Sequence, residues 1–243
     1  MSHLHIPDGV LPLPWIIAGL AATAVILLLC VFSVKRQDRA RTVPRIAILS
    51  AVMMLAMSLP IPVLHYHVNL TVLVGMMAGP AEGFIAGFIT NLILALTAHG
   101  GITVIGLNAL ITGLEITLGW LLWKALRDRG GRPLVKSGFI TLVVLAVSTT
   151  AMLGIVAGTR VNPTLAMHDH HVHSSDMDAH LESVKPFATI AYTAGAVGWA
   201  IEAIVTGSVV QFISESRPDL VGMSVALEPK GDGDQPKTDS EEG

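Results

Sequence analysis

The chain has 243 residues, of which 52% are hydrophobic and 14% are charged, and its mean hydropathy is +0.65. A soluble domain usually carries about 25% charged residues, so this composition excludes an ordinary soluble protein and indicates an integral membrane protein. The net charge of −3 gives no sign of nucleic-acid binding, and the single cysteine, Cys30, excludes an internal disulfide or a Cys-x-x-Cys site.

The first apolar run covers residues 11–34. It is longer than the apolar part of a signal peptide, no basic segment precedes it, and a basic cluster follows it, so we expect it to remain as a transmembrane helix. The basic cluster at residues 35–45 is cytoplasmic by the positive-inside rule, which places the amino terminus outside.

Four apolar segments have close to the ~20 residues that a helix needs to cross a membrane: 12–34, 46–64, 137–158 and 187–214. Residues 69–126 form a further, ambiguous apolar stretch. The second basic cluster, at residues 124–136, is also expected inside, so an odd number of crossings must precede it.

Gly-rich breaks at residues 79–83 and 99–101 divide the ambiguous stretch into three predicted crossings: 69–78, 84–98 and 102–126. The first is short for a full span, and such a segment is tolerated only where protein covers it or a cavity adjoins it.

The expected fold is therefore an all-α integral membrane protein with seven transmembrane helices, the amino terminus outside and the carboxyl terminus in the cytoplasm. Residues 1–219 form the membrane domain, residues 159–186 an external loop, and residues 220–243 an acidic, disordered tail. In this topology all ten histidines lie on the external face: His3, His5, His65, His67, His99, His168, His170, His171, His173 and His180.

Two histidine pairs lie at the same expected membrane level. His3 and His5 follow the amino terminus, and His65 and His67 lie where the second helix emerges. A terminal amine, deprotonated amides and imidazoles can surround one ion with a square of nitrogens, which suits Ni(II), Cu(II) or Co(II). The alternative is that these histidines are amphipathic interfacial residues, but two convergent pairs favour a metal site.

Other polar residues surround this candidate site. Asn69, His99 and Asn108 are candidates for orienting the ligands or for hydrogen bonds between helices. The predicted external loop carries a histidine-rich tract that indicates low-affinity metal capture, with a polar loop lacking any ligand as the alternative: His168, His170, His171 and His173.

Three acidic residues fall in the apolar region. Glu115 and Glu202 lie inside predicted helices, and ionisable groups at membrane depth normally face the bundle or a partner. Glu82 falls in a predicted cytoplasmic turn, where no buried partner is expected.

Several motifs, taken together, match a known family. They are His5-Ile6-Pro7-Asp8-Gly9, His67-Val68-Asn69, Ala98-His99-Gly100-Gly101-Ile102-Thr103 with Gly106 and Asn108, and Glu202-Ala203-Ile204-Val205-Thr206-Gly207 with Arg217-Pro218. Up to about residue 219 the chain resembles the CbiM/NikM family, the substrate-binding membrane components of energy-coupling-factor transporters for cobalt and nickel.

This resemblance implies a seven-helix fold whose amino-terminal segment plugs an external cavity. It implies a metal held by the terminal amine, by the amide and imidazole of His5, and by His67. It also implies a transmembrane coupling subunit and a pair of cytoplasmic ATPases as partners, with a small accessory membrane protein as a further candidate. The protein would then lie in the inner membrane of a prokaryote and hold no cofactor besides the transported ion.

One departure from the family motif leaves the ligand set open. The family motif usually begins Met-His, whereas three residues precede that position here. Removal of the initiator methionine before Ser2 would create a new Ser2-His3 terminus. Either His3 takes the chelating role, or His5 keeps it. Cobalt and nickel are adjacent in the affinity order, so the ligands do not distinguish them.

Two other functions compete with metal uptake. A membrane metalloenzyme would hold zinc through His65, His67 and the terminal histidines, but no His-Glu-x-x-His motif is present. A histidine-rich secondary transporter would need ligands near the membrane midplane, where only Glu115 and Glu202 qualify. The chain has no phosphate-binding Gly-x-x-x-x-Gly-Lys-Ser/Thr loop, so ATP hydrolysis is expected from partner subunits rather than from this non-enzymatic component.

Overall fold

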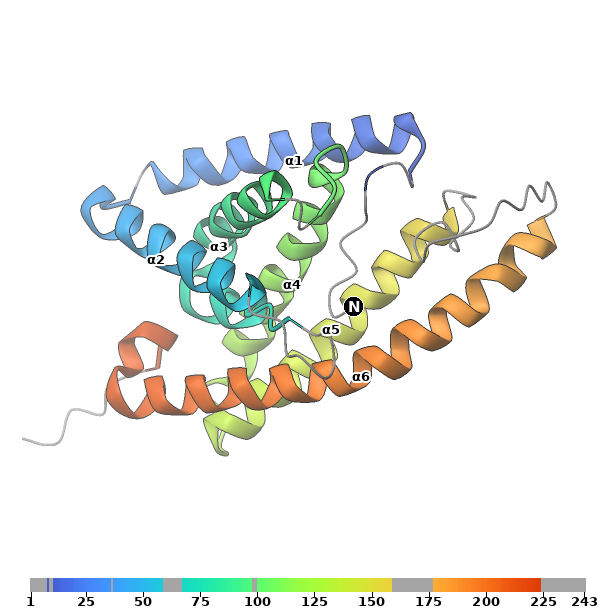
Figure 1. The fold of residues 1–243 in the computed structure, drawn as a ribbon. Coiled ribbons are helices and arrows are strands. Elements are labelled where there is room, and N and C mark those ends of the chain that lie inside the picture. The colour runs from blue at the N-terminus through green and yellow to red at the C-terminus, as the bar shows by residue number, and fades with distance from the viewer. Residues whose placement is uncertain are drawn as a thin grey trace, which may run out of the picture.

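A computed structural model describes residues 8, 11–35, 37–58, 67–97, 100–158 and 177–223 of the protein as a bundle of helices (Figure 1). Within these residues there is no strand, in agreement with the predicted all-α class. The elements are α1 (Leu13–Val34), α2 (Arg39–Ser58), α3 (Thr71–Leu96), α4 (Ile105–Leu126), α5 (Pro133–Gly158), α6 (Met177–Ser216) and the short 3₁₀ helix η2 (Pro218–Val221).

Among the described residues, six helices are long and apolar enough to cross a membrane, whereas the sequence predicted seven crossings. The difference lies in α3, which replaces the two predicted crossings 69–78 and 84–98. Its first segment, residues 71–78, is only about 12 Å long at 1.5 Å per residue, against a hydrocarbon core of about 30 Å. The count of seven full crossings is therefore not confirmed.

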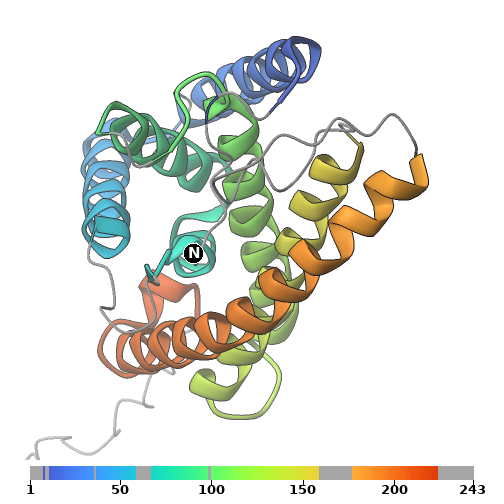
Figure 2. The ribbon, with the colours of Figure 1, turned by 45° about the vertical axis from the view of Figure 1, so that its right-hand side comes forward.

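The break within α3 lies in the Gly-rich stretch, residues 79–83, at which the sequence predicted one. Gly79 has φ 74° and ψ −177°, a conformation that favours glycine, and Pro80 follows it inside the element. Val74 approaches to 3.6 Å from the place where a Cβ on Gly83 would lie. Residues nine apart in a straight helix are separated by about 13.5 Å. The segments 71–78 and 80–96 therefore fold toward each other, and Figure 2 shows them as separate rods.

Protein covers the short first segment of α3, as the sequence analysis required. Residues 71–76 are all buried. Close packing against α4 depends on small residues, because a Cβ on Gly75 would lie 2.2 Å from the carbonyl oxygen of Ile116 and one on Gly119 would lie 3.1 Å from Val72. Glycine at these positions lets the two backbones approach.

Two predicted boundaries differ from the structure. The second helix begins at Arg39 rather than at residue 46, so three arginines expected in a loop belong to α2. The predicted external loop ends at residue 186, but α6 already begins at Met177. Both helices continue beyond the apolar residues from which their boundaries were predicted.

The basic residues gather at one end of the bundle, which we call the basic end. It comprises the α1–α2 and α4–α5 connections, the neighbouring helix ends and the end of α6. It holds every lysine and arginine whose side chain the structure describes: Lys35, Arg39, Arg41, Arg45, Lys124, Arg127, Arg129, Arg132, Lys136 and Arg217. The positive-inside rule predicts that this end faces the cytoplasm.

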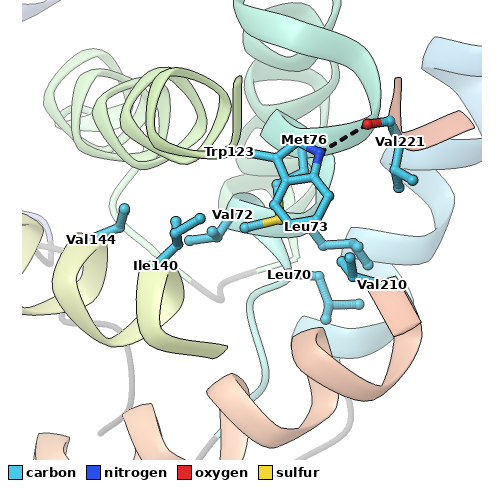
Figure 3. Packing of buried hydrophobic residues seen from close by; sticks show 9 residues of the cluster. All are labelled: Leu70, Val72, Leu73, Met76, Trp123, Ile140, Val144, Val210 and Val221. Atoms are coloured by element: carbon cyan, nitrogen blue, oxygen red, sulfur yellow. Dashed lines mark hydrogen bonds between the residues drawn. The ribbon is translucent and has the colours of Figure 1, made fainter. Parts of the chain in front are cut away.

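A hydrophobic cluster joins α3, α4, α5 and α6 to η2 near the basic end (Figure 3). Trp123 is 1% exposed, and its indole N–H donates a 2.9 Å hydrogen bond to the Val221 carbonyl. Leu73 and Met76, from the short segment of α3, belong to the same cluster. η2 is therefore fixed against the helix bundle.

Glu82 is not the solvated turn residue that the sequence analysis expected. It lies just after the break in α3 and is 3% exposed. The Arg45 guanidinium contacts both of its carboxylate oxygens, at 2.7 and 2.8 Å. A buried carboxylate needs such a partner, and here the pair ties α2 to the break in α3.

Candidate metal-binding region

The structure describes three of the predicted site residues: His67, Asn69 and Asn108. The others lie outside the described residues: Ser2, His3, His5, His65, His99, His168, His170, His171 and His173. In the described part of the chain, no three His, Cys, Asp or Glu side chains converge as a metal site. The set of nitrogen ligands thus stays a prediction. The structure does describe the parts of the chain that would hold two of these ligands in place.

His67 begins a segment without regular secondary structure, residues 67–70, that leads directly into α3. Its side chain is partly buried, whereas Asn69 is 2% exposed. Leu70 has a φ of 59°, a left-handed conformation that a leucine rarely adopts. Such a conformation persists only where the surrounding contacts determine it, so the contacts of Asn69 and Leu70 define the position of this segment.

The carboxylate of Glu202, on α6, accepts two backbone hydrogen bonds from this segment. The N–H of Asn69 donates to one oxygen at 3.3 Å, and the N–H of Leu70 donates to the other at 3.2 Å. Glu202 is fully buried. A negative charge at the start of α3 is also favoured by the helix dipole.

Glu115, on α4, holds the same segment through side chains. Its carboxylate accepts hydrogen bonds from the Asn69 amide at 2.9 Å, the Thr71 hydroxyl at 2.6 Å and the Ser148 hydroxyl at 2.5 Å. Glu115 is 1% exposed. Burying a charge is costly unless hydrogen bonds compensate it, and these three donors, two at the start of α3 and one from α5, supply that compensation.

The two glutamates lie deep in the bundle. Glu115 is the eleventh residue of the 22 in α4, and Glu202 is near the middle of the apolar part of α6. The segment that follows His67 therefore enters the bundle to about half its depth. The expectation that both carboxylates face the bundle is confirmed, and Asn69 is bonded to both of them. A role of Asn69 in orienting a metal ligand stays a prediction.

Asp8, three residues after His5 in the sequence, is bonded to the connection that precedes α4. Its carboxylate accepts hydrogen bonds from the Ile102 N–H at 3.1 Å, the Thr103 N–H at 2.8 Å and the Thr103 hydroxyl. These bonds, led by that of the Thr103 hydroxyl, lower the pKa of Asp8 below its ordinary value. Asp8 is therefore ionised at neutral pH and fixed to the connection that precedes α4.

The contact between Asp8 and the connection before α4 explains why residue 101 is a glycine. A Cβ on Gly101 would lie 2.7 Å from the Asp8 backbone nitrogen and 2.5 Å from a Val104 methyl group. Only glycine leaves the room that Asp8 occupies. Leu11 packs beside Val104 and Leu107, which continues the docking into an apolar cluster.

Asn108 is buried in the first turn of α4, five residues after Thr103. It thus lies near the Asp8 contact in sequence, and its role in orienting a ligand stays a prediction.

Sequence reasoning missed the role of Asp8 and the way the two glutamates act together. Both partners were visible in the sequence, as an acidic residue shortly before an apolar run and a Gly-Gly-Ile-Thr turn before a helix. Which turn the Asp8 carboxylate contacts depends on the tertiary structure and cannot be predicted from a local sequence pattern.

Comparisons with known proteins agree with this architecture. Residues 5–220 match the family model described as the cobalt uptake substrate-specific transmembrane region. The chain is 25% identical over 244 residues to the cobalt transport protein CbiM of Geobacter sulfurreducens, covering 96% of this chain and 66% of that protein. It is 27% identical over 225 residues to a putative cobalt transport protein CbiM of Methanococcus voltae, covering 89% of this chain and 94% of that protein.

Solved structures share the fold. The crystal structure of a transition metal transporter superposes with a TM-score of 0.69 at 20% identity, covering 87% of this chain and 93% of that one. A truncated transition metal transporter superposes with the same TM-score at 22% identity, covering 87% and 99%.

Proposed function

Because the chain belongs to the CbiM family of substrate-specific membrane components for cobalt uptake, we propose that it binds Co(II), with Ni(II) as the competing ion, and passes it into the cell as part of an energy-coupling-factor transporter. The ion is the substrate, and the chain is a transport component rather than an enzyme. A coupling subunit and two cytoplasmic ATPases would supply the energy.

The observation that carries this proposal is that α4 and the connection immediately before it hold the chain close in sequence to both predicted ligands, His5 and His67. Asp8, three residues after His5, is bonded to Ile102 and Thr103 immediately before α4. Asn69, two residues after His67, is bonded to Glu115 in the middle of α4. α4 and the connection before it thus hold Asp8 and Asn69, which supports a site shared between the nearby histidines.

In this proposal the nitrogens of the terminal segment and the imidazole of His67 surround the ion. The chain restricts the ligands before the ion arrives, because Asp8 holds one segment and the two buried glutamates hold the other. Preorganised ligands bind more tightly, since less conformational entropy is lost on binding. Glu115 and Glu202 act as positioning residues and not as ligands.

The same contacts suggest how the ion is released. The segment 67–70 cannot move without breaking its bonds to Glu115 and Glu202, which come from two different helices. A partner that separates α4 from α6 would therefore displace His67 from the ion. We propose that the coupling subunit acts in this way.

Metal titration of the purified protein by calorimetry tests the site. We expect high-affinity binding of Co(II) or Ni(II), and we expect it to be lost both in His67→Ala and in protein with a blocked amino terminus. His5→Ala and His3→Ala, measured separately, decide which terminal histidine chelates. The absorbance spectrum of the Ni(II)-bound protein reports whether the ligands surround the ion in a square-planar arrangement. Unchanged affinity in both His67→Ala and the blocked protein would refute the site.

Transport requires a separate measurement. Uptake of labelled Co(II) and Ni(II) by cells that express the chain with its coupling subunit and ATPases should exceed uptake without those partners. Direct competition between the two ions identifies the preferred one. A chain that transports alone, driven by an ion gradient, would instead support the secondary transporter.

A further inference from the structure

A groove with a volume of about 970 Å³ opens at the basic end, where α2, the break in α3, the end of α4 and η2 meet. Four arginines line it, together with one carboxylate, that of Asp219: Arg41, Arg45, Arg127 and Arg217. It lies at the far end of α4 from the Asp8 contact, so it is separate from the metal-binding region.

Arg45 contributes to the wall of the groove rather than to ligand binding. Its guanidinium is engaged by both oxygens of Glu82, which is 3% exposed. Releasing this pair would leave a buried carboxylate without compensation, which is strongly unfavourable. The charge of Arg45 therefore stabilises the fold and is not available to a ligand.

The other three arginines have acidic partners near the protein surface. Arg41 is 3.7 Å from Asp38, with side-chain exposures of 90% and 63%, and Arg127 is 3.5 Å from Asp128, with exposures of 29% and 73%. Such single, loose contacts to an exposed carboxylate contribute little free energy, so a bound anion can replace Asp38 and Asp128 at low cost. Arg217 makes two hydrogen bonds to Asp219, at 3.0 and 2.9 Å, and the other N–H groups of its guanidinium remain to contact an anion.

The surroundings keep the groove positive even with those partners counted. The basic end holds ten described lysines and arginines against five carboxylates: Asp38, Glu82, Asp128, Glu215 and Asp219. Guanidinium groups bind phosphate well, because their paired N–H donors match its oxygens. The charge of the groove thus fits a phosphate group.

The rest of the lining is apolar. Ile48, Leu49, Met76, Met77 and Leu220 line the groove beside the arginines. Ile48 is 63% exposed and belongs to the apolar surface of α2, so this wall continues toward lipid. Trp120, also in the lining, has the ammonium group of Lys124 5.0 Å from its ring centre. An aromatic ring next to a lysine is typical of the level of the lipid headgroups.

We propose that this groove binds one anionic phospholipid, with its phosphate against Arg41, Arg127 and Arg217 and an acyl chain along the apolar wall formed by Ile48 and Met77. A soluble phosphate would make no use of the apolar wall. An acidic protein segment would need no opening toward lipid. Basic pockets between transmembrane helices on the cytoplasmic side are suited to anionic headgroups.

Occupation of the groove would connect elements distant in sequence. Arg41 belongs to α2, Arg127 follows α4, and Arg217 precedes η2. η2 is itself fixed to α4 through Trp123 and Val221, so the wall it provides is rigid (Figure 3). We therefore expect bound lipid to stabilise the bundle against thermal unfolding.

The test uses the full chain in detergent, with phosphatidylglycerol or phosphatidylcholine added. Native mass spectrometry measures retained lipid, and thermal unfolding measures stabilisation. Arg41→Gln/Arg217→Gln removes two groove charges, and because both side chains are exposed the fold is expected to persist. Arg129→Gln/Arg132→Gln is the matched control, since it removes two charges from the same end outside the groove lining.

We expect phosphatidylglycerol to be retained and to raise the unfolding temperature in the native chain and the control. In the groove variant we expect at least about tenfold weaker retention and no such rise. Equal losses in both variants would show only a general surface charge effect and would overturn the proposal. Competition by glycerol phosphate at equal concentration would identify a soluble phosphate site, and competition by polyglutamate an acidic peptide site; either would also overturn it.

Discussion

Asp8 and Thr103 lie 95 residues apart in the chain, yet the carboxylate of Asp8 accepts hydrogen bonds from both the backbone N–H and the hydroxyl group of Thr103. The contact joins two motifs that the sequence presents separately, His-Ile-Pro-Asp-Gly and His-Gly-Gly-Ile-Thr. It fixes the chain just after His5 and leaves room only for glycine at position 101.

Asp8→Asn tests whether this contact supports metal binding. Asparagine keeps one acceptor oxygen and loses the charge, so it cannot satisfy all three donors, and the terminal segment should be held less firmly. We expect Co(II) or Ni(II) affinity to fall about 10- to 100-fold, as for other outer groups that orient metal ligands. Calorimetric titration measures this change.

Asp38→Asn is the control, because it removes an exposed carboxylate at the opposite end of the bundle. Its metal affinity should equal that of the native chain. If Asp8→Asn also bound metal normally, docking of the terminal segment would have no part in the site.

The pH dependence should separate metal release from undocking. The pKa of Asp8 is lowered in the folded protein, so its contribution to docking is complete above its ordinary value near 3.8 and is lost as the pH falls through the lower, folded value. Imidazole ligands must be deprotonated and ordinarily titrate near pH 6.5. We therefore expect metal to leave near pH 6 while Asp8 stays docked.

Protection of the Ile102 and Thr103 amides against hydrogen exchange, measured across this pH range, monitors the docking directly. Loss of that protection in step with metal release would contradict two separate transitions.

The sequence predicted most of the membrane architecture, and its errors have physical causes. Apolar length and the basic clusters identified the helices, and Gly79-Pro80 was recognised as a break. Hydropathy, however, does not distinguish a short buried segment such as 71–78 from a crossing helix, because both are apolar. It also missed Glu82, since the partner that makes its burial tolerable, Arg45, lies 37 residues earlier.

The candidate site, too, could be predicted only in part. The burial of Glu115 and Glu202 was predicted, because ionisable groups at membrane depth need partners. Their common partner, the segment that follows His67, depends on how α3, α4 and α6 meet and is not contained in any local pattern. The expected topology and the pairing of the histidines suggested the ligands, and the resemblance to a known family implied His5 and His67 among them, but neither carries information on what holds them.

Glu202→Gln should weaken the anchoring of the segment 67–70. A glutamine presents one acceptor oxygen to the two N–H groups of Asn69 and Leu70, and its amide group is itself a donor. One buried N–H is left unsatisfied, which costs about 1–3 kcal/mol. We expect a lower unfolding temperature and a weaker metal affinity in the same variant.

Glu215→Gln, near the exposed end of α6, is the matched control and should change neither quantity. Metal affinity measured well below the unfolding temperature distinguishes positioning from stability. A Glu202→Gln protein that is less stable but binds metal with native affinity would show that the carboxylate stabilises the fold alone.

Gly106→Ala tests the crossing of α1 over α4. A Cβ at this position would lie 2.6 Å from the backbone carbon of Gly19, and the Thr23 hydroxyl donates a 2.7 Å hydrogen bond to the Gly106 carbonyl nearby. Backbone atoms cannot yield as a flexible side chain does, so α1 must move outward. We expect a loss of about 1–3 kcal/mol in stability, the usual cost of overpacking. Gly130→Ala is the comparison, because no atom lies within 4 Å of its Cβ position. Thermal unfolding of both variants in the same detergent measures the difference. Equal unfolding temperatures would mean that α1, which is largely exposed along its length, is not held at this crossing.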